Sequence, residues 1–326
     1  MVAGLNLDSL GIPQRLSGAR FEVHANPHAQ SSYTDVLARR IAEQHAPAGE
    51  WAMAAFDTTD AVIADPSIGI PTPWLGEMTS HLWHSSLDTP DKLDARTLAT
   101  EGVVAATYLY AVANAGAGDI PWLGREVYQE TVRQIDEAAQ MMPEPQTGSW
   151  DEAWRQTSRR LGYVADRGRQ ALGSCARLGS SPDAAAALAG YDRQLDAELE
   201  RRLLSIERRL AVRAGAGWSR PGPAPLSRAE QEAARMAPRR TAPGGLSLGR
   251  LPRDAWPEAA RITHGENPRW SKALSCALYW ADGQRSMLEV RQRLEQELGP
   301  LDFDLFEYFR FLARHGYMEL SPAGGR

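Results

Sequence analysis

The run Trp83–Asp94 holds the residues whose types and spacing best fit metal chemistry. His84 follows a Gly- and Pro-rich segment, precedes a long apolar helix and has carboxylates nearby, with Asp88 four residues on. A neutral imidazole is a good zinc ligand, and its second nitrogen usually bonds to a carboxylate or a carbonyl. His84 is therefore a candidate metal ligand. The alternative is an ordinary loop histidine, with Asp88 and Thr89 capping a turn.

Two motifs resemble those of a known family. The run His84-Ser85-Ser86-Leu87-Asp88-Thr89 fits the pattern His-Thr/Ser-x-x-Asp-Thr, the last zinc-ligand motif of the two-zinc aminopeptidase and glutamate-carboxypeptidase family (clan MH, family twenty-eight). Residues 4–11 resemble that family's strand Asn-Leu-Asp-Met-x-Gly, whose aspartate binds the other zinc and matches Asp8. The resemblance covers residues 3–116 and includes the family's closing helix, here residues 98–115.

This resemblance implies a zinc-exopeptidase-like sheet, two zinc ions and a peptide substrate. A metal-bound hydroxide would attack the peptide carbonyl, with a glutamate as base. The implied metal ligands in this chain are Asp8 and His84, one for each zinc.

The chain departs from the family at the rest of the site. The early histidine, the bridging aspartate and the Glu–Glu pair all precede the Asp8 strand in the family, and only seven residues precede Asp8 here. The glycines and the histidine of the family's Gly-Gly-Ser-Asp-His loop are also missing from residues 56–61. A zinc ion needs at least three protein ligands. We therefore expect a truncated or inactive metallopeptidase with weak or absent zinc binding. The alternative is a non-catalytic scaffold or partner-binding protein built on a degenerate peptidase fold.

Other polar residues have simpler interpretations. His24 and His28 are four residues apart, but the proline between them forbids a helical zinc-binding face, so we expect exposed loop residues. Glu77 and Asp91 are expected to be solvated loop carboxylates. Cys175 falls on a helical apolar face and is expected in the core.

Composition limits the class of protein and its compartment. The chain has 326 residues, with 36 basic and 41 acidic side chains, a net charge of −5. This balance argues against a protein that coats nucleic acid. Two cysteines cannot build a disulfide framework. Neither a signal peptide nor a membrane-spanning run of 18 apolar residues is visible, so we expect a cytoplasmic protein without a membrane partner.

Residues 1–118 alternate between strand and helix patterns, which is typical of an α/β fold. The resemblance implies that its sheet is a partial mixed or parallel sheet, the carboxy-terminal part of a zinc-aminopeptidase-like domain. The alternating or apolar runs predict four strands and two helices. The strands are expected at 5–10, 20–24, 52–56 and 61–64, and the helices at 33–42 and 95–115. The first strand has few features that protect a sheet edge, so we expect aggregation or a homo-oligomer through that edge.

The rest of the chain reads as mainly helical. Residues 119–213 predict a helical hairpin or bundle, with helices at 122–142, 150–178 and from 182. Residues 214–249, rich in Pro, Gly and Arg, predict a linker. Residues 250–326 predict helices at about 271–281, 286–298 and 303–315, then a strand, which resembles a small winged-helix-like α+β module.

The charge of this last module argues against a nucleic-acid partner. The helix at 286–298 carries two arginines against three glutamates, and a recognition helix normally has a basic surplus. Packing or partner docking is the expected role of the module.

Overall fold

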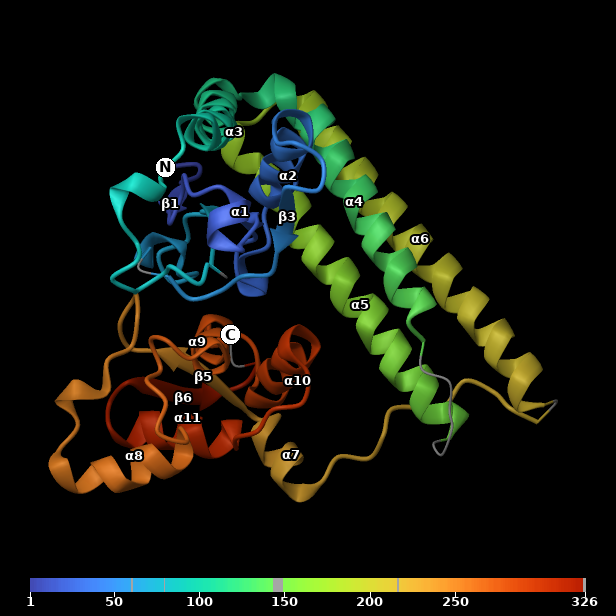
Figure 1. Ribbon diagram of the computed structural model, residues 1–326. Coiled ribbons are helices and arrows are strands. Elements are labelled where there is room, and N and C mark those ends of the chain that lie inside the picture. The colour runs from blue at the N-terminus through green and yellow to red at the C-terminus, as the bar shows by residue number, and fades with distance from the viewer. Residues whose placement is uncertain (60, 79, 143–148, 216, 325–326) are drawn as a thin grey trace. The chain divides into compact units, whose positions relative to one another are not determined.

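The computed structural model describes residues 1–59, 61–78, 80–142, 149–215 and 217–324. It is a mixed helix and sheet protein, as the sequence predicts for the coarse α/β class. The chain divides into two compact units (Figure 1). Unit 1 comprises Met1–Asn26, Gln30–Phe56 and Ile70–Gly222, and unit 2 comprises Pro27–Ala29, Asp57–Gly69 and Pro223–Arg326.

Unit 1 contains a four-stranded mixed sheet in the order β1-β4-β2-β3. Its strands are β1 Asn6–Asp8, β2 Phe21–His24, β3 Trp51–Ala54 and β4 Trp74–Gly76. β1 pairs in parallel with β4, β2 pairs in parallel with β3, and the central pair β2–β4 is antiparallel. β1 is therefore an edge strand, as the sequence predicts, and its Leu7 is 51% exposed.

The first helices of unit 1 are α1 Gln14–Ser17, α2 Tyr33–His45 and α3 Ala95–Asn114. Ser32 and Asp35 form a capping box at the start of α2, which explains why the helix begins there. The Asp94 side chain accepts the Thr97 N–H at 2.9 Å and caps α3 in the same way.

The buried face of α3 differs from the apolar positions that first indicated a helix. Val104, Ala105, Tyr108 and Val112 are buried, together with Glu101. Leu98, Val103, Ala106, Leu109 and Val112 recur at helical spacing and predict this helix, but only Val112 of these five is buried. The helix is thus confirmed, whereas the face that it buries is set by the sheet and α2 and not by its most apolar stripe.

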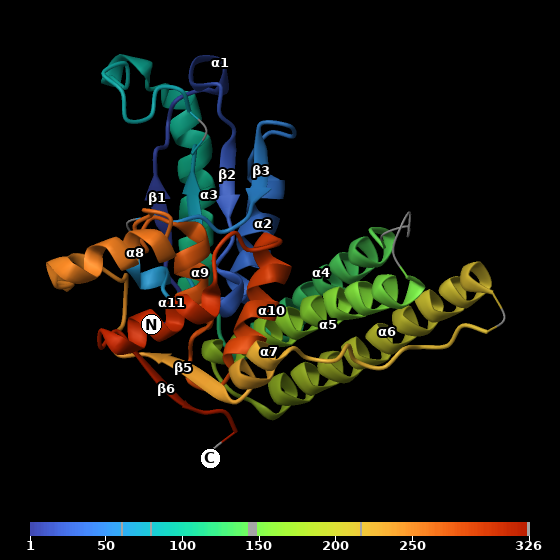
Figure 2. The ribbon, with the colours of Figure 1, turned by 90° about the horizontal axis from the view of Figure 1, so that it is seen from below.

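Three long helices complete unit 1: α4 Ile120–Gln140, α5 Trp150–Ser174 and α6 Pro182–Ala214. They lie side by side and pack on one another (Figure 2). Their apolar faces share Ile135, Leu161, Leu195 and Leu210, each 0% exposed. The predicted helical bundle is thus present in this part of the chain.

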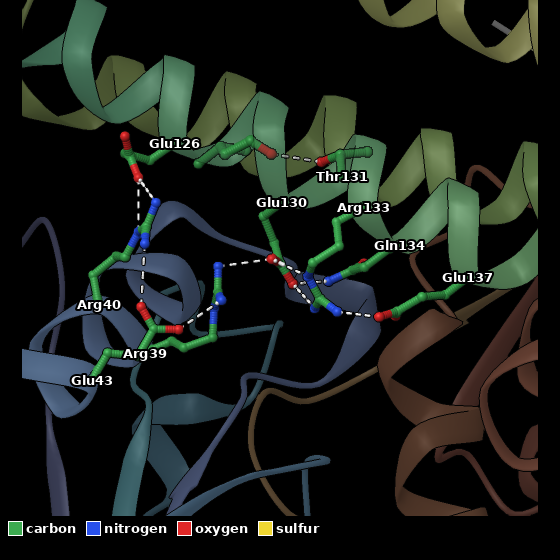
Figure 3. Close-up of polar contacts among 10 residues, drawn as sticks. Arg39, Arg40, Glu43, Glu126, Glu130, Thr131, Arg133, Gln134 and Glu137 are labelled. Atoms are coloured by element: carbon green, nitrogen blue, oxygen red, sulfur yellow. Dashed lines mark hydrogen bonds and ion pairs between the residues drawn. The ribbon is translucent and has the colours of Figure 1, made fainter. Parts of the chain in front are cut away.

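Charged side chains join α2 to α4 (Figure 3). Arg39 pairs with Glu130 at 2.7 Å, and Arg40 pairs with Glu126 at 2.5 Å. Arg133 pairs with Glu130 at 2.6 Å from within α4. Both glutamates are buried, so the arginines offset the cost of removing the carboxylates from water.

Unit 2 has helices around a two-stranded antiparallel sheet. The helices are α7 Arg228–Ala233, α8 Trp256–Ile262, α9 Lys272–Trp280, α10 Met287–Leu298 and α11 Leu305–Arg314, and the strands are β5 Met236–Arg240 and β6 Met318–Pro322. The three helices predicted after residue 270 match α9, α10 and α11. Tyr308, Phe309 and Leu312 of α11 are each 0% exposed and lie in the core of this unit.

Two sequence expectations need correction. The predicted strand at 61–64 is instead a short 3₁₀ helix, Val62–Ala64. The predicted linker at 214–249 contains α7 and β5, and Ala233 and Ala237 in it are buried at 0% and 1% exposure. The high proline and glycine content predicted a linker, but Pro238 lies in a strand at the edge of a sheet, where its missing N–H is tolerated.

Candidate functional site

The predicted metal ligand Asp8 is the last residue of β1. Its side chain is half-buried, and the Ser9 hydroxyl donates a hydrogen bond to Asp8 Oδ1 at 3.2 Å. Ser9 has a φ of 57°, in the left-handed region that non-glycine residues rarely adopt. The chain therefore turns sharply directly after Asp8.

The other predicted ligand, His84, lies on the loop between β4 and α3. Its side chain is exposed and stacks on Trp83, with ring centroids 3.6 Å apart. His84 also has a positive φ, 55°. Asp88, the expected carboxylate neighbour, is exposed, and its backbone N–H donates to the Ser85 carbonyl.

Both predicted segments leave the sheet at the same end, where the parallel strands β1 and β4 have their carboxyl ends. Asp8 pairs in register with Gly76, the last residue of the parallel neighbour β4. The segment that carries His84 leaves the sheet directly after Gly76. Ligand sites of parallel strands form at such carboxyl ends. Across the described residues, however, no group of three or more His, Cys, Asp or Glu side chains is placed to hold a metal ion.

Two buried glutamates that the sequence analysis did not select meet near this end of the sheet. Glu77 follows β4 and is 3% exposed, and Glu101 lies on α3 and is 2% exposed. The expectation of a solvated Glu77 is therefore wrong. Both side chains line a cavity of about 510 Å³ in unit 1, together with Arg15, Glu50 and Arg96.

Burial disfavours the ionised form of both carboxyls, and the charge of Glu101 adds to this cost at Glu77. Burial and the charge of Glu101 raise the pKa of Glu77 to about 8, although the Ser17 hydroxyl acts in the opposite direction. Burial also raises the pKa of Glu101 to about 6, against hydrogen bonds from Glu77 and the Gly11 N–H. Two adjacent carboxyls with different pKa values can share one proton at neutral pH, which is the arrangement that general acid–base chemistry uses.

Gly11 fixes the position of Glu101. Its N–H donates to Glu101 Oε2 at 2.8 Å, and its carbonyl accepts the Asp94 N–H at 2.9 Å. Gly11 has a φ of 95°, and a Cβ there would lie 2.5 Å from Leu98 Cδ2. Only glycine satisfies both conditions. The turn after β1 and the first turns of α3 are thus tied together around the carboxyl pair.

One sequence signal could have identified Glu101. It precedes Val104, Ala105, Tyr108 and Val112 at spacings that put all five residues on one helical face. A lone carboxylate on an apolar face has to be paired, protonated or functional. Glu77 carries no comparable signal, because a carboxylate after a short strand looks the same whether it is exposed or buried.

The remaining candidate residues also have defined surroundings. His24 is 4% exposed in β2 and not in an exposed loop: Nε2 contacts Glu22 Oε2 at 2.9 Å and the ring stacks on Trp74. Cys175 is 0% exposed, as predicted, and burial raises the pKa of its thiol to about 12. Such a thiol is inert as a nucleophile at neutral pH.

Unit 2 contains a buried ion pair. Asp65, 3% exposed, accepts two hydrogen bonds from the Arg240 guanidinium at 2.6 and 2.9 Å. Burial raises the pKa of Asp65, but the hydrogen bonds and charge of Arg240, with hydrogen bonds from Ser67, outweigh it, and the pKa is lowered. This pair joins the segment Asp57–Gly69 to β5 within unit 2.

No protein-family model matches the chain, and neither a curated protein nor a solved structure matches it. In the part of the chain that the structure describes, no helix has both the length and the apolar character needed to cross a bilayer.

Proposed function

We propose that this chain is a metallopeptidase-like protein of the two-zinc aminopeptidase type, in an inactive form. One observation supports the proposal: the parallel strands β1 and β4 end side by side, and Asp8 and the segment with His84 both come from these carboxyl ends. The positive φ values of Ser9 and His84 add to it, because strained backbone is often found at functional sites. The compartment that we propose is the cytoplasm.

The residues present do not fit a complete two-zinc centre. Asp8 and His84 supply one carboxylate and one imidazole, whereas each zinc ion takes at least three protein ligands in a catalytic site. The described residues supply no third ligand to either. We therefore propose no hydrolytic step for the chain as it stands, and zinc binding should be weak.

Activity and zinc measurements test this proposal. The full chain should not hydrolyse aminoacyl p-nitroanilides in excess zinc, and calorimetry should show weak zinc binding that His84→Ala weakens further. His28→Ala is a matched control for loss of one histidine. Turnover that His84→Ala abolishes would contradict the inactive form and mean that other residues complete the site.

The coding DNA upstream of Met1 offers a separate test of the resemblance. Read in frame, it should encode His-x-Asp, a lone aspartate and a Glu-Glu pair if the protein is a peptidase. A stop codon shortly before Met1 would instead favour the non-catalytic alternative.

That alternative, a partner-binding scaffold, is favoured by one specific observation. The outer face of α3 exposes Leu98, Val103, Leu109 and Tyr110, at 43%, 47%, 49% and 72% exposure. Exposed apolar patches of this kind often mark interaction sites. β1 lies at the edge of the sheet, where another strand could be added.

The partner proposed for this face is a second copy of the chain. An apolar, uncharged face is self-complementary, as a two-fold symmetric dimer requires. Light scattering should show a concentration-dependent dimer that Val103→Glu dissociates, with Glu200→Gln on α6 as a control. A monomer at all concentrations would contradict this proposal.

For unit 2 we propose a winged-helix-like docking module. The antiparallel pair β5–β6 and the helices α9 to α11 support it. Arg291 of α10 pairs with Glu230 at 2.5 Å and with Glu295 at 3.6 Å. These carboxylates compete with phosphate for the arginine, which favours a protein partner over a nucleic acid.

A further inference from the structure

The cavity of unit 1 is lined by a glutamate, Glu77, whose carboxyl has one buried oxygen without a hydrogen-bond partner among the described residues. Glu77 Oε2 is buried and unpartnered, although its residue is only 3% exposed and lines a cavity of about 510 Å³. A buried polar atom left without a partner is unfavourable. Among the described residues, Gly11 donates a hydrogen bond to Glu101, whereas none donates to this atom. The Glu77 carboxyl, which lines the cavity, therefore lacks a hydrogen-bond donor.

We propose that this cavity binds a small organic cation with N–H donors, an ammonium or guanidinium group, between Glu77 and Glu101. The cation would donate to the Glu77 carboxyl and would offset the repulsion between the two carboxylates. This inference goes beyond the proposed function and does not depend on zinc or on His84.

The size and lining of the cavity favour an organic cation over a bare metal ion. Small-molecule sites occupy about 300–1,000 Å³, and this cavity lies in that range. A divalent ion prefers six or more oxygen ligands or a cluster of three or more protein side chains. Arg15 and Arg96 also line the cavity, and because their repulsion scales with the charge of the ligand, they disfavour a divalent ion more than a monovalent cation.

Proton linkage gives the binding a characteristic pH dependence. Because the pKa of Glu77 is raised to about 8, its carboxyl holds a proton at pH 7, and a bound cation has to displace that proton. Affinity for the cation should therefore rise by up to about tenfold per pH unit from pH 6 to pH 8 and then level off. The other charged groups that line the cavity are Arg15, Glu50, Asp94 and Arg96.

The experiment uses the full chain and three monovalent probes. Methylguanidinium and n-butylammonium both carry N–H donors, and comparing them shows whether the cavity prefers a guanidinium or an ammonium group. Tetramethylammonium has the same charge but no N–H donor. Calorimetry at pH 8 should show binding of at least one N–H cation, with tetramethylammonium at least tenfold weaker.

Variants locate the site. Glu77→Gln and Glu101→Gln keep the side-chain shape and should each weaken binding at least tenfold, whereas the exposed Glu200→Gln should have no effect. Circular dichroism checks that the variants fold. If one glutamine variant does not fold, the other is enough to test the proposal. The proposal is wrong if neither N–H cation binds, if tetramethylammonium binds equally well, or if both glutamine variants bind like the parent. Zinc binding that both glutamine variants abolish, without cation binding, would reassign the cavity to a metal.

Discussion

Asp65 in unit 2 and Glu77 in unit 1 are both 3% exposed, yet their pKa values shift in opposite directions. Burial disfavours the charged form of each. Asp65 faces the Arg240 guanidinium, which more than compensates and lowers its pKa. Glu77 faces another carboxyl, Glu101, which adds to the effect of burial and raises its pKa. Burial alone therefore does not decide whether a carboxyl in this protein is ionised.

The comparison indicates that Asp65 has a structural role, whereas Glu77 is available to interact with a ligand. The bidentate pair of Asp65 with Arg240 satisfies both charges inside the protein, so it stabilises the fold and has little capacity for a ligand. In the pair of Glu77 with Glu101, one oxygen, Glu77 Oε2, has no hydrogen-bond partner among the described residues, and both residues line a cavity. Unsatisfied buried carboxyls reduce stability, and proteins commonly retain such groups where they serve a function.

The largest expected effect comes from breaking the compensated pair. Arg240→Met leaves Asp65 buried without its cation, and the free energy of unfolding of unit 2 should fall by about 3–5 kcal/mol at pH 7. Because the pKa of Asp65 is lowered in the parent, this contribution is present at neutral pH and is lost as the pH falls through that pKa. Urea denaturation at pH 7 and pH 3 measures both values.

The double variant Arg240→Met with Asp65→Asn is the matched control. It removes both charges and should recover part of the lost stability. An Arg240→Met variant as stable as the parent at pH 7 would mean that solvent reaches Asp65 and that the two acids are not comparable.

A smaller effect of opposite sign is expected at the carboxyl pair. Glu77→Gln removes a carboxyl whose pKa rises from an ordinary value of 4.5 to about 8 on folding. Between pH 4.5 and pH 8 the carboxyl ionises more readily in the unfolded state than in the folded state, so the free energy of unfolding falls as the pH rises through this range. Below pH 4.5 the carboxyl is protonated in both states and has no such effect. The variant should be more stable than the parent by about 1–3 kcal/mol at pH 8 and equal to it near pH 4.

Thermal denaturation of the parent and of Glu77→Gln across pH 4–8 checks this prediction. Glu50→Gln, which changes another carboxyl of the same cavity, controls for a general loss of negative charge. Equal stability of the parent and Glu77→Gln at pH 8 would show that the Glu77 carboxyl is not disfavoured by burial.

The smallest effect should come from the charged interface between α2 and α4. Arg40→Met removes the nearer of two arginine partners of Glu126, which is 8% exposed and also pairs with Arg125 at 3.7 Å. Since the Arg40 side chain is itself 43% exposed, solvent screening limits the loss to about 0.5–1.5 kcal/mol. Urea denaturation should show this loss, and 0.5 M salt should reduce it. If Arg40→Met lost as much stability as Arg240→Met, the contribution of these ion pairs to stability would not depend on their exposure to solvent.

Local signals in the sequence predicted most helices and three of the four strands in unit 1. Ser32 and Asp35 start α2 through a capping box, which involves only neighbouring residues. The apolar spacing of α4 to α6 and of α9 to α11 likewise repeats within each segment. β5 escaped prediction because its proline-containing sequence becomes a strand only when β6, about 80 residues later, pairs with it.

The sequence by itself determined the helices with regular apolar spacing and the burial of Cys175. Only the tertiary structure decided that Glu77 and Glu101, 24 residues apart, share a cavity. It also decided that α3 buries Glu101 and exposes Val103. Periodicity records which residues share a helical face, but the surface against which that face packs depends on the strand order and on contacts between distant segments. The charge state of a buried carboxyl depends on the same contacts, because its partner comes from elsewhere in the chain.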